Sequence, residues 1–575
     1  MTDNEFKPKL GRIRDGSRAK ALPYARDVLD QLDKTAGRPL RPAGNRLRHG
    51  QQRGLASGAL AASGLVAPGS RRAIVKARYT KLDGAAAHLR YILRDGITSD
   101  GQPGRLYNEA GDHADGKAFL ARSDADPHQF RFIISSEDSD RLPELKPMIR
   151  DLMRQMEEDL GVKLDWVAVD HFNTGHPHTH VVLRGRDRGG QDLILARQYI
   201  SHGIRSRVQE LVTLELGPET DLERLRKLVN EVGQERLTRL DRSLLAQAKD
   251  NVLAITAYHE QDPSRHAMRM GRLKTLERLG LAEERQRGVW LLDAKLEGKL
   301  RQLGDRADKL KMMQRALDAA GIERQPGTMA VFERGDRKVP VVGRVVGVGL
   351  VDEITDRQYV VVDGVDGRVH YAELGRRSAD AAPQRGMIVK LAADRLEGRP
   401  QASSRIEVLS PADLRGQETY LGPTWLDEVI SGKERLPRLS TGFGSEVERA
   451  LATRVRWLTE RQLAERSPEG QVSFKPDALA TLRRHETERL AGDLARHYGV
   501  PFSPAVPGVS FSGVYDRAIT TPTAKLAIIR TDTSITVAPW RPALEPMRGQ
   551  RVQGIMHQTR VVWTLERGRG LVPPR

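Results

Sequence analysis

Two apolar segments rich in β-branched residues lie on either side of a short polar turn, and this pairing strongly constrains the fold. Leu164 to Phe172 and Thr179 to Leu183 read as strands, and the Asn-Thr-Gly between them is typical of a hairpin turn. Four of the chain's 15 histidines fall in this region. Because strand side chains alternate between faces, His178 and His180 are expected on one face, and His171 reaches it from the facing strand.

These three histidines form the pattern of a metal site. Neutral imidazoles that converge from two rigid strands leave coordination positions open to water or a substrate oxygen, which suits a divalent Lewis acid. The alternative is a solvated or hydrogen-bonded His-x-His pair with no ligand role. His176 has the same parity, but Pro177 indicates an irregular strand entry, so we expect His176 to face DNA or support a ligand.

Composition limits the class of protein. The 575 residues, 39% of them hydrophobic, suffice for several domains. The absence of cysteine excludes disulfides, thiol catalysis and Cys-ligated zinc. No segment approaches the roughly 20 apolar residues that span a bilayer, and the N-terminus lacks the apolar core of a signal peptide. We therefore expect a cytoplasmic protein without membrane insertion.

The charge points to a polyanionic partner. The formal net charge is +18, and residues 1–72 hold 15 Lys and Arg against 6 Asp and Glu. Excess positive charge attracts phosphates and releases their counterions, so nucleic acid is the expected partner. Residues 1–72 read as a flexible basic arm, with a merely solubilising tail as the alternative.

The next region mixes strands and helices, which predicts an α/β (α+β) domain with a central antiparallel sheet over residues 73–220. The predicted strands lie near 73–79, 129–135, 164–172 and 179–184, and the predicted helices near 85–94, 143–160 and 197–214.

The rest of the chain indicates a multidomain protein. A helix ending at Gly280 and a hairpin with the basic tip Arg285-Gln-Arg-Gly288 match a winged helix, although a generic helix-hairpin unit fits as well. Residues 500–508 read as a linker, and no repeat of fixed period is evident. The expected regions are helical and winged-helix-like (221–325), small β-barrel-like (326–410), helical (411–500) and a C-terminal β domain (501–575).

Three tyrosines compete for the role of a nucleophile near the histidines. Tyr91 projects from the face opposite the apolar stripe of its predicted helix, and Arg90 and Arg94 beside it would attract phosphate. Tyr79 shares strand parity with apolar neighbours, which favours core packing. Tyr199, after the histidines, remains a rival.

Three segments together resemble a known family. They are His-Leu-Arg-Tyr91-Ile-Leu-Arg-Asp-Gly96, Phe130-Arg-Phe-Ile-Ile-Ser135 and His171-x-Asn-x-x-His-Pro-His178-x-His180. Their order resembles the three motifs of conjugative relaxases of the HUH superfamily, and is most similar to the mobilisation group that includes the T-DNA border endonuclease. The order favours Tyr91 over Tyr199, because the related rolling-circle initiators carry their tyrosine after the histidines. The resemblance covers about residues 73–217.

The resemblance implies a relaxase that nicks single-stranded origin-of-transfer DNA for plasmid transfer. Tyr91 would attack one phosphodiester, giving a 5′-phosphotyrosyl link that can be reversed by strand rejoining. The three histidines would hold Mg²⁺ or Mn²⁺, although imidazoles also accept Zn²⁺ or Ni²⁺ readily. Ser135 would contact DNA near the cleavage point.

One position departs from the family pattern. Relatives often carry an acidic residue where this chain has Asn173, which puts in doubt any carboxylate that orients a histidine. The adjacent Asp170 is a hypothetical substitute.

The resemblance also implies partners and a location. Auxiliary nicking proteins, a coupling ATPase and the type IV secretion machinery are expected, in a bacterial cytoplasm and with translocation alongside DNA. No G-x-x-x-x-G-K-[ST] loop occurs, so no built-in helicase motor is expected. The winged helix and the terminal β domain would supply duplex binding or protein docking.

Two other functions remain open. His176-Pro-His178-Thr-His180 also fits a histidine-triad nucleotide hydrolase, in which His178 is a metal-free nucleophile. A non-catalytic DNA-binding scaffold of a transfer complex would use only the basic arm and the winged helix. Chelation separates these from a metal-dependent nuclease.

Overall fold

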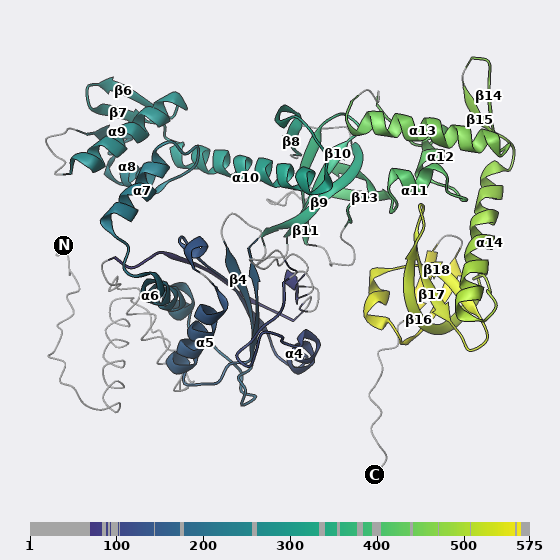
Figure 1. The fold of residues 1–575 in the computed structure, drawn as a ribbon, viewed down its shortest axis with the longest axis horizontal. Coiled ribbons are helices and arrows are strands. Elements are labelled where there is room, and N and C mark those ends of the chain that lie inside the picture. Colours follow the sequence, from purple (N-terminus) through teal and green to yellow (C-terminus); the bar gives the residue numbers. More distant parts are fainter. Residues whose placement is uncertain are drawn as a thin grey trace, which may run out of the picture. The chain divides into compact units, whose positions relative to one another are not determined.

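The computed structural model divides into two compact units, Met1–Arg224 and Leu225–Arg575, which are treated separately below (Figure 1). It describes residues 69–82, 85, 88–89, 92–93, 102, 104–142, 144–172, 177–255, 262–332, 340–352, 357–376, 383–393, 404–437, 441–469, 471–506, 508–557 and 560–564. The predicted basic arm thus lies almost wholly outside the described residues. No described helix is long and apolar enough to cross a membrane.

The N-terminal unit is built on a four-stranded sheet in the order β1-β2-β4-β3, and every neighbouring pair is antiparallel. The strands are β1 (Ala73–Thr80), β2 (Gln129–Ser136), β3 (Trp166–His171) and β4 (His178–Arg184). The four predicted strands and the antiparallel sheet are therefore confirmed. Tyr107 extends the sheet beyond β3, because its backbone exchanges hydrogen bonds with Ala168.

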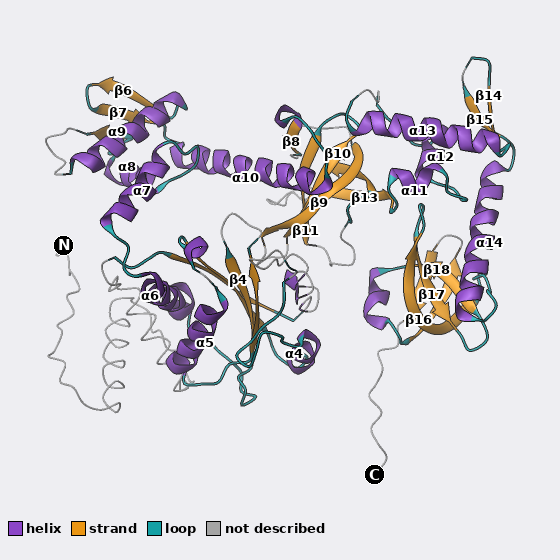
Figure 2. Ribbon diagram, in the orientation of Figure 1, coloured by secondary structure: helices purple, strands orange, loops and turns teal. Residues whose placement is uncertain are grey.

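One face of this sheet carries the main apolar core. Alternate residues of the four strands, such as Val75, Phe132, Ala168 and Val181, pack in one cluster. Three helical segments cover this face (Figure 2), and they are α5 (Lys146–Leu160), the π-helical turn η3 (Tyr199–Gly203) and α6 (Ile204–Leu216). The helices predicted near 143–160 and 197–214 are confirmed, with ends that differ by a few residues.

The opposite face is covered by α4 (Gly116–Ser123) and the described part of the predicted helix near 85–94. Ala85, His88, Leu89, Ile92 and Leu93 are all helical. Leu89 and Ile92 are buried, as the apolar stripe predicted. A Cβ built on Gly116 would lie 3.1 Å from Leu89 Cδ2, so α4 and this helix approach closely.

Arg71 fixes the chain where it enters β1. Its buried guanidinium donates to the Gly217 carbonyl at 2.8 Å and to Asp138 Oδ2 at 3.1 Å. It also donates to both carboxylate oxygens of Glu223 at 3.2 Å, near the start of α7 (Asp221–Val232). This one side chain therefore connects the first strand with the C-terminal end of α6 and the following helix.

The C-terminal unit contains two successive modules, and the first covers residues 238–410. A three-stranded sheet, β5-β7-β6, packs with helices, and a six-stranded sheet follows in the order β13-β12-β9-β10-β11-β8. Its elements are α8 (Arg239–Gln247), β5 (Val252–Ala254), α9 (Pro263–Arg278), β6 (Ala282–Gln286), β7 (Val289–Leu292), α10 (Leu296–Ala320), β8 (Met329–Val331), β9 (Val341–Asp352), β10 (Arg357–Gly364), β11 (Val369–Arg376), β12 (Ile388–Ala393) and β13 (Ser404–Ser410).

The second module covers residues 424–564 and follows the short helix α11 (Leu414–Glu418). Its five-stranded sheet has the order β18-β17-β16-β19-β20. Its elements are α12 (Trp425–Ile430), α13 (Phe443–Glu460), β14 (Ala464–Arg466), β15 (Val472–Phe474), α14 (Ala478–Tyr498), β16 (Ser510–Thr520), β17 (Lys525–Arg530), β18 (Ile535–Pro539), β19 (Arg551–His557) and β20 (Arg560–Thr564).

The two modules repeat one architecture, although no repeat of fixed period is evident in the sequence. Each runs from a short capped helix through a longer helix, a hairpin and another long helix into an antiparallel sheet. The order β13-β12-β9-β10-β11 is the order β20-β19-β16-β17-β18 in the second module. The short parallel strand β8 beside β11 also has a counterpart, because Phe502 forms a parallel bridge to Ile535 of β18.

A buried polar cluster is repeated as well. Thr238 and Asp241 form a capping box, and Asp241 accepts two hydrogen bonds from the buried Arg272 at 2.7 and 2.8 Å. In the second module Thr424 and Asp427 form the same capping box, and Asp427 accepts two hydrogen bonds of 2.8 Å from Arg454. The shared sequence is Thr-x-Leu-Asp, followed later by Arg-x-x-x-Leu-x-x-x-x-Leu-Ala-Glu.

The segment expected to be a linker between residues 500 and 508 is partly paired. The Ile535 amide donates to the Pro501 carbonyl at 2.9 Å, and the Ser503 amide donates to the Ile535 carbonyl at 2.7 Å. The prolines in this segment indicated a linker. However, proline is tolerated in an edge strand, so the segment can still pair with β18.

Candidate functional site

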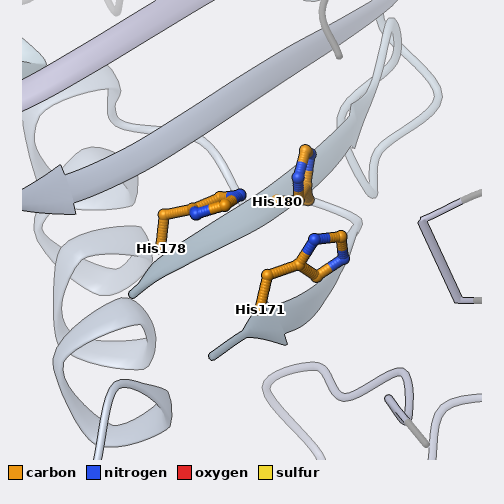
Figure 3. A group of neighbouring side chains, drawn as sticks. All are labelled: His171, His178 and His180. Carbon is orange, nitrogen blue, oxygen red and sulfur yellow. The ribbon is translucent and has the colours of Figure 1, made fainter. Parts of the chain in front are cut away.

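The strand register brings the three predicted histidines together. His171 of β3 lies directly opposite His178 of β4, and His180 follows on the same face. Their potential ligand atoms all lie within 4.8 Å of one another (Figure 3). The side chains are 2%, 8% and 2% exposed. The face is the one opposite the main apolar core, because that core takes the alternate residues of both strands.

This arrangement fits a divalent metal ion. The ring centroids are 4.4 Å apart for His171 and His180, 5.2 Å for His171 and His178, and 5.1 Å for His178 and His180. Metal–nitrogen bonds of about 2.0–2.1 Å place two ligand atoms of one ion at most about 4 Å apart. The potential ligand atoms here lie within 4.8 Å of one another, so small side-chain adjustments would bring them to that separation. Two strands of one antiparallel sheet hold all three rings, so little ordering is needed to complete the site.

His171 also connects the site to the helix near residues 85–94. Its Nε2 lies 2.8 Å from the Ile92 carbonyl oxygen, and both residues are buried. The polypeptide immediately around Ile92 therefore lies against the histidines. Sequence reasoning placed this helix and the histidines in one domain but did not foresee this contact.

Ser135 lies beside the histidines. It is directly opposite His178 in the pairing of β2 with β4, so the two side chains share a face. Its hydroxyl donates to the Pro177 carbonyl at 2.9 Å. The end of the motif at residues 130–135 therefore lies beside the histidine motif at residues 171–180.

Asp170 does not join the triad, which corrects the hypothesis that it supports a histidine. Strand alternation places it on the core face, where its Oδ1 accepts hydrogen bonds from Tyr107 at 2.8 Å and Thr179 at 2.7 Å. Burial raises the pKa of the Asp170 carboxyl above its ordinary value. Burial also raises the pKa of the Tyr107 phenol, and the Asp170 charge adds to this shift. These three residues form a polar group within the core.

The two rival tyrosines occupy different environments. Tyr199 is fully buried in the core on the face away from the histidines, and its hydroxyl donates to Asp159 Oδ2 at 2.9 Å. Burial raises the pKa of its phenol. Tyr79 was expected in the core, but it is 60% exposed because it lies near the end of β1, and its ring packs against His128 and Phe130.

The edge strand β1 adds side chains that sequence reasoning missed. Ile74 and Lys76 alternate with the core residues of β1, and both are exposed. Ile74 pairs with Ser135, so this row lies on the histidine face, one strand beyond β2. Their parity relative to Val75 is the signal that would have identified them.

The remaining predicted site residues lie outside the described residues. They are Arg90, Tyr91, Arg94, Asn173 and His176.

Comparison with known proteins gives one family match. A family described as a protein of unknown function (DUF3363) matches residues 269–402 and 393–572, which is more than half of the chain. No curated protein and no solved structure matches it. The match contains most of both repeated modules and begins after the histidine site.

Proposed function

The chain belongs to the DUF3363 family of proteins of unknown function, so its activity must be argued from its own site, and we propose that its N-terminal unit is a metal-dependent DNA relaxase. In this proposal Tyr91 cleaves one phosphodiester of single-stranded origin-of-transfer DNA. The three histidines hold the catalytic ion.

The observation that carries the proposal is the contact between His171 and Ile92. The carbonyl of Ile92 lies 2.8 Å from Nε2 of one histidine of the triad. Tyr91 is the residue directly before Ile92 in the sequence. Tyr91 and His171 are 80 residues apart in the sequence, and the contact of the neighbouring Ile92 with His171 supports the proposal that the nucleophile acts beside the metal site.

Tyr199 is a poor alternative because of its position. Its hydroxyl is bonded to Asp159 in the core, and the four-stranded sheet separates that core from the histidine face. Attack on a phosphate held by the histidines would require the core to open. This favours Tyr91.

The reaction balances without a co-reactant. The Tyr91 oxygen forms a bond to phosphorus as the bond from phosphorus to the 3′-oxygen breaks, and the proton of the phenol is ultimately carried by the released 3′-hydroxyl. The phosphotyrosyl bond replaces a phosphodiester, so the same residues can catalyse strand rejoining. When bound, a divalent ion would neutralise charge on the scissile phosphate as the transition state forms. His171, His178 and His180 would hold it.

The exposed row on β1 provides a surface for the strand. Lys76 offers a positive charge and Ile74 an apolar surface on the histidine face. Single-stranded DNA binds to basic surfaces that also offer stacking or apolar contacts. Ser135, which lies on β2 between β1 and the triad, would contact the phosphate backbone in this proposal.

The test is incubation of the full chain with a labelled single-stranded oligonucleotide from its own origin region and Mg²⁺ or Mn²⁺, followed by a denaturing gel. A covalent protein–DNA product that is lost in Tyr91→Phe and kept in Tyr199→Phe is the expected result. Tyr199→Phe is the matched control, because it removes one phenolic hydroxyl from the same domain. Loss of the covalent product in Tyr199→Phe alone would show that Tyr199, and not Tyr91, is the nucleophile.

Chelation separates the proposal from the two other functions. A metal-dependent relaxase loses the covalent product when a chelator is added and regains it when metal is restored. Nucleotide hydrolysis that survives chelation would instead support a histidine nucleophile. Binding without any covalent product, with every metal, would support a scaffold.

A further inference from the structure

The two modules of the C-terminal unit match residue by residue around their hairpins. One constant offset relates Arg272 to Arg454, and the same offset relates Leu276 to Leu458 and Leu300 to Leu482, all of them fully buried. The backbone follows it too, since the amides of Leu281 and Leu463 each bond the carbonyl five residues earlier. Equivalent surface positions can therefore be compared directly.

The comparison reveals a difference in charge. Residues 263–292, which contain α9 and the β6–β7 hairpin, hold seven Lys or Arg against three Asp or Glu. The equivalent residues 445–474 hold five of each. At the hairpin tip Arg285 and Arg287 are exposed, whereas their equivalents are Ser467 and Glu469.

In the second module the first half of α13 is already covered. Val447 is fully buried in a cluster with Val342 and Ile388 of the first module's sheet. Glu446 accepts hydrogen bonds from Arg324 at 3.0 Å and from Arg344 at 2.9 Å. This helix face therefore serves to pack the second module onto the first.

In the first module the start of the equivalent face is exposed, whereas Met268, the equivalent of Ala450, is buried. Arg265 occupies the position of Val447 and is exposed near the start of α9. The hairpin runs back along α9, because Lys274 contacts Glu284 at 3.0 Å. With a rise of about 1.5 Å per helical residue and about 3.3 Å per strand residue, the hairpin tip extends about 7–10 Å from Lys274 toward the start of α9, against about 13.5 Å from Lys274 to Arg265. The exposed arginines of the hairpin tip and of the helix start therefore lie toward the same end of this helix-hairpin unit.

We propose that this surface of the first module binds duplex DNA, with α9 in the major groove and the hairpin tip on the phosphate backbone. A helix followed by a basic hairpin is the arrangement by which winged helices contact duplexes. Three exposed arginines match the phosphate charge, and the corresponding face of the second module is occupied. The duplex site is separate from the histidine site and does not depend on the nicking activity.

The test measures binding of the full chain to a labelled blunt duplex by fluorescence anisotropy, in a Tyr91→Phe background. The triple variant Arg265→Ala, Arg285→Ala, Arg287→Ala is expected to weaken binding about 10- to 100-fold. The slope of log affinity against log salt should flatten by about 2 to 3, because up to three phosphate contacts are lost. Circular dichroism melting checks that the variant is folded.

The matched control removes three exposed arginines from the second module, with Arg456→Ala, Arg461→Ala and Arg466→Ala. It changes the net charge equally, so the proposal requires that it leaves duplex affinity within about twofold. Equal weakening by both triple variants, or no weakening by the first, overturns the proposal. Single-strand cleavage with Tyr91 intact is measured in parallel, and it tests the relaxase proposal independently of duplex binding.

Discussion

Two buried clusters, one in each unit, hold their polar side chains in opposite ways. In the C-terminal unit the repeated buried guanidinium meets an acidic partner: Arg454 donates to both oxygens of Asp427 and to the carbonyls of Tyr420 and Gly422. In the N-terminal unit three rings of one kind, His171, His178 and His180, face one another. Matched opposite charges are typical of structural burial, whereas a cluster of like bases is typical of a ligand set.

Under the proposed function, this difference separates residues that stabilise the fold from residues that hold a ligand. The arginine cluster occurs twice and joins a helix cap to a long helix, and both arginines are fully buried. The histidine cluster occurs once among the described residues, beside a helix that leads to Tyr91. The following predictions test this distinction, beginning with the largest expected effect.

Arg454→Met should reduce the free energy of unfolding by about 3–5 kcal/mol, because it leaves the Asp427 charge buried without its partner. Urea unfolding followed by tryptophan fluorescence measures this, since Trp425 and Trp457 lie close by. Replacing both partners, as in Asp427→Leu with Arg454→Met, should cost far less, about 1 kcal/mol for the lost cap. A double variant as unstable as the single one would contradict a purely structural role.

His180→Ala should lower the rate of single-strand cleavage by about 100-fold or more, equivalent to about 2.7 kcal/mol of transition-state stabilisation. In the absence of metal, His180→Ala should lower the free energy of unfolding much less than Arg454→Met does. Exposed His202→Ala, in the same unit, is the control and should cleave normally. A normal cleavage rate in His180→Ala would show that the histidine cluster has a structural role and no catalytic one.

Mn²⁺ should stabilise the N-terminal unit by about 2.7 kcal/mol when its concentration is about 100 times Kd. Differential scanning fluorimetry with and without metal measures the shift. The shift should disappear in His178→Ala and persist in Tyr91→Phe. If the metal effect survives loss of His178, the ion binds elsewhere.

Glu223 tests whether a matched pair in the N-terminal unit behaves like those in the C-terminal unit. Hydrogen bonds from the Thr220 amide, and then from Arg141 and Arg71, lower its pKa to about 2. A lowered carboxyl pKa stabilises the fold above the ordinary value of 4.5, and this contribution is lost as the pH falls toward about 2. Glu223→Gln should therefore flatten the pH dependence of melting within that window, and an unchanged slope would argue against the linkage.

The sequence predicted the site well where strand parity governs it. The alternation of His178 and His180, and the facing position of His171, followed from the two-residue period alone. The same rule excludes Asp170, because adjacent strand residues point to opposite faces. Tyr79 had the correct parity, but parity does not reveal where the covering layer ends, and the described structure leaves this residue exposed.

The repeat was missed in the sequence, because the two short shared motifs of each module lie at unequal spacing. Asp241 and Arg272 are 31 residues apart, whereas Asp427 and Arg454 are 27 apart. The helices and strands between them tolerate substitution as long as their apolar pattern is kept. Only the shared strand order and the paired caps reveal the equivalence.

The contact of His171 with Ile92 also decides the chemistry of that ring. A carbonyl oxygen can only accept, so Nε2 carries the hydrogen and, in the neutral ring, Nδ1 carries the lone pair. Such a bond orients a ligating ring and raises its basicity. Under the proposed function, the residue that follows Tyr91 sets the tautomer of a metal ligand, and a DNA strand that shifts Ile92 would change how tightly the ion is held.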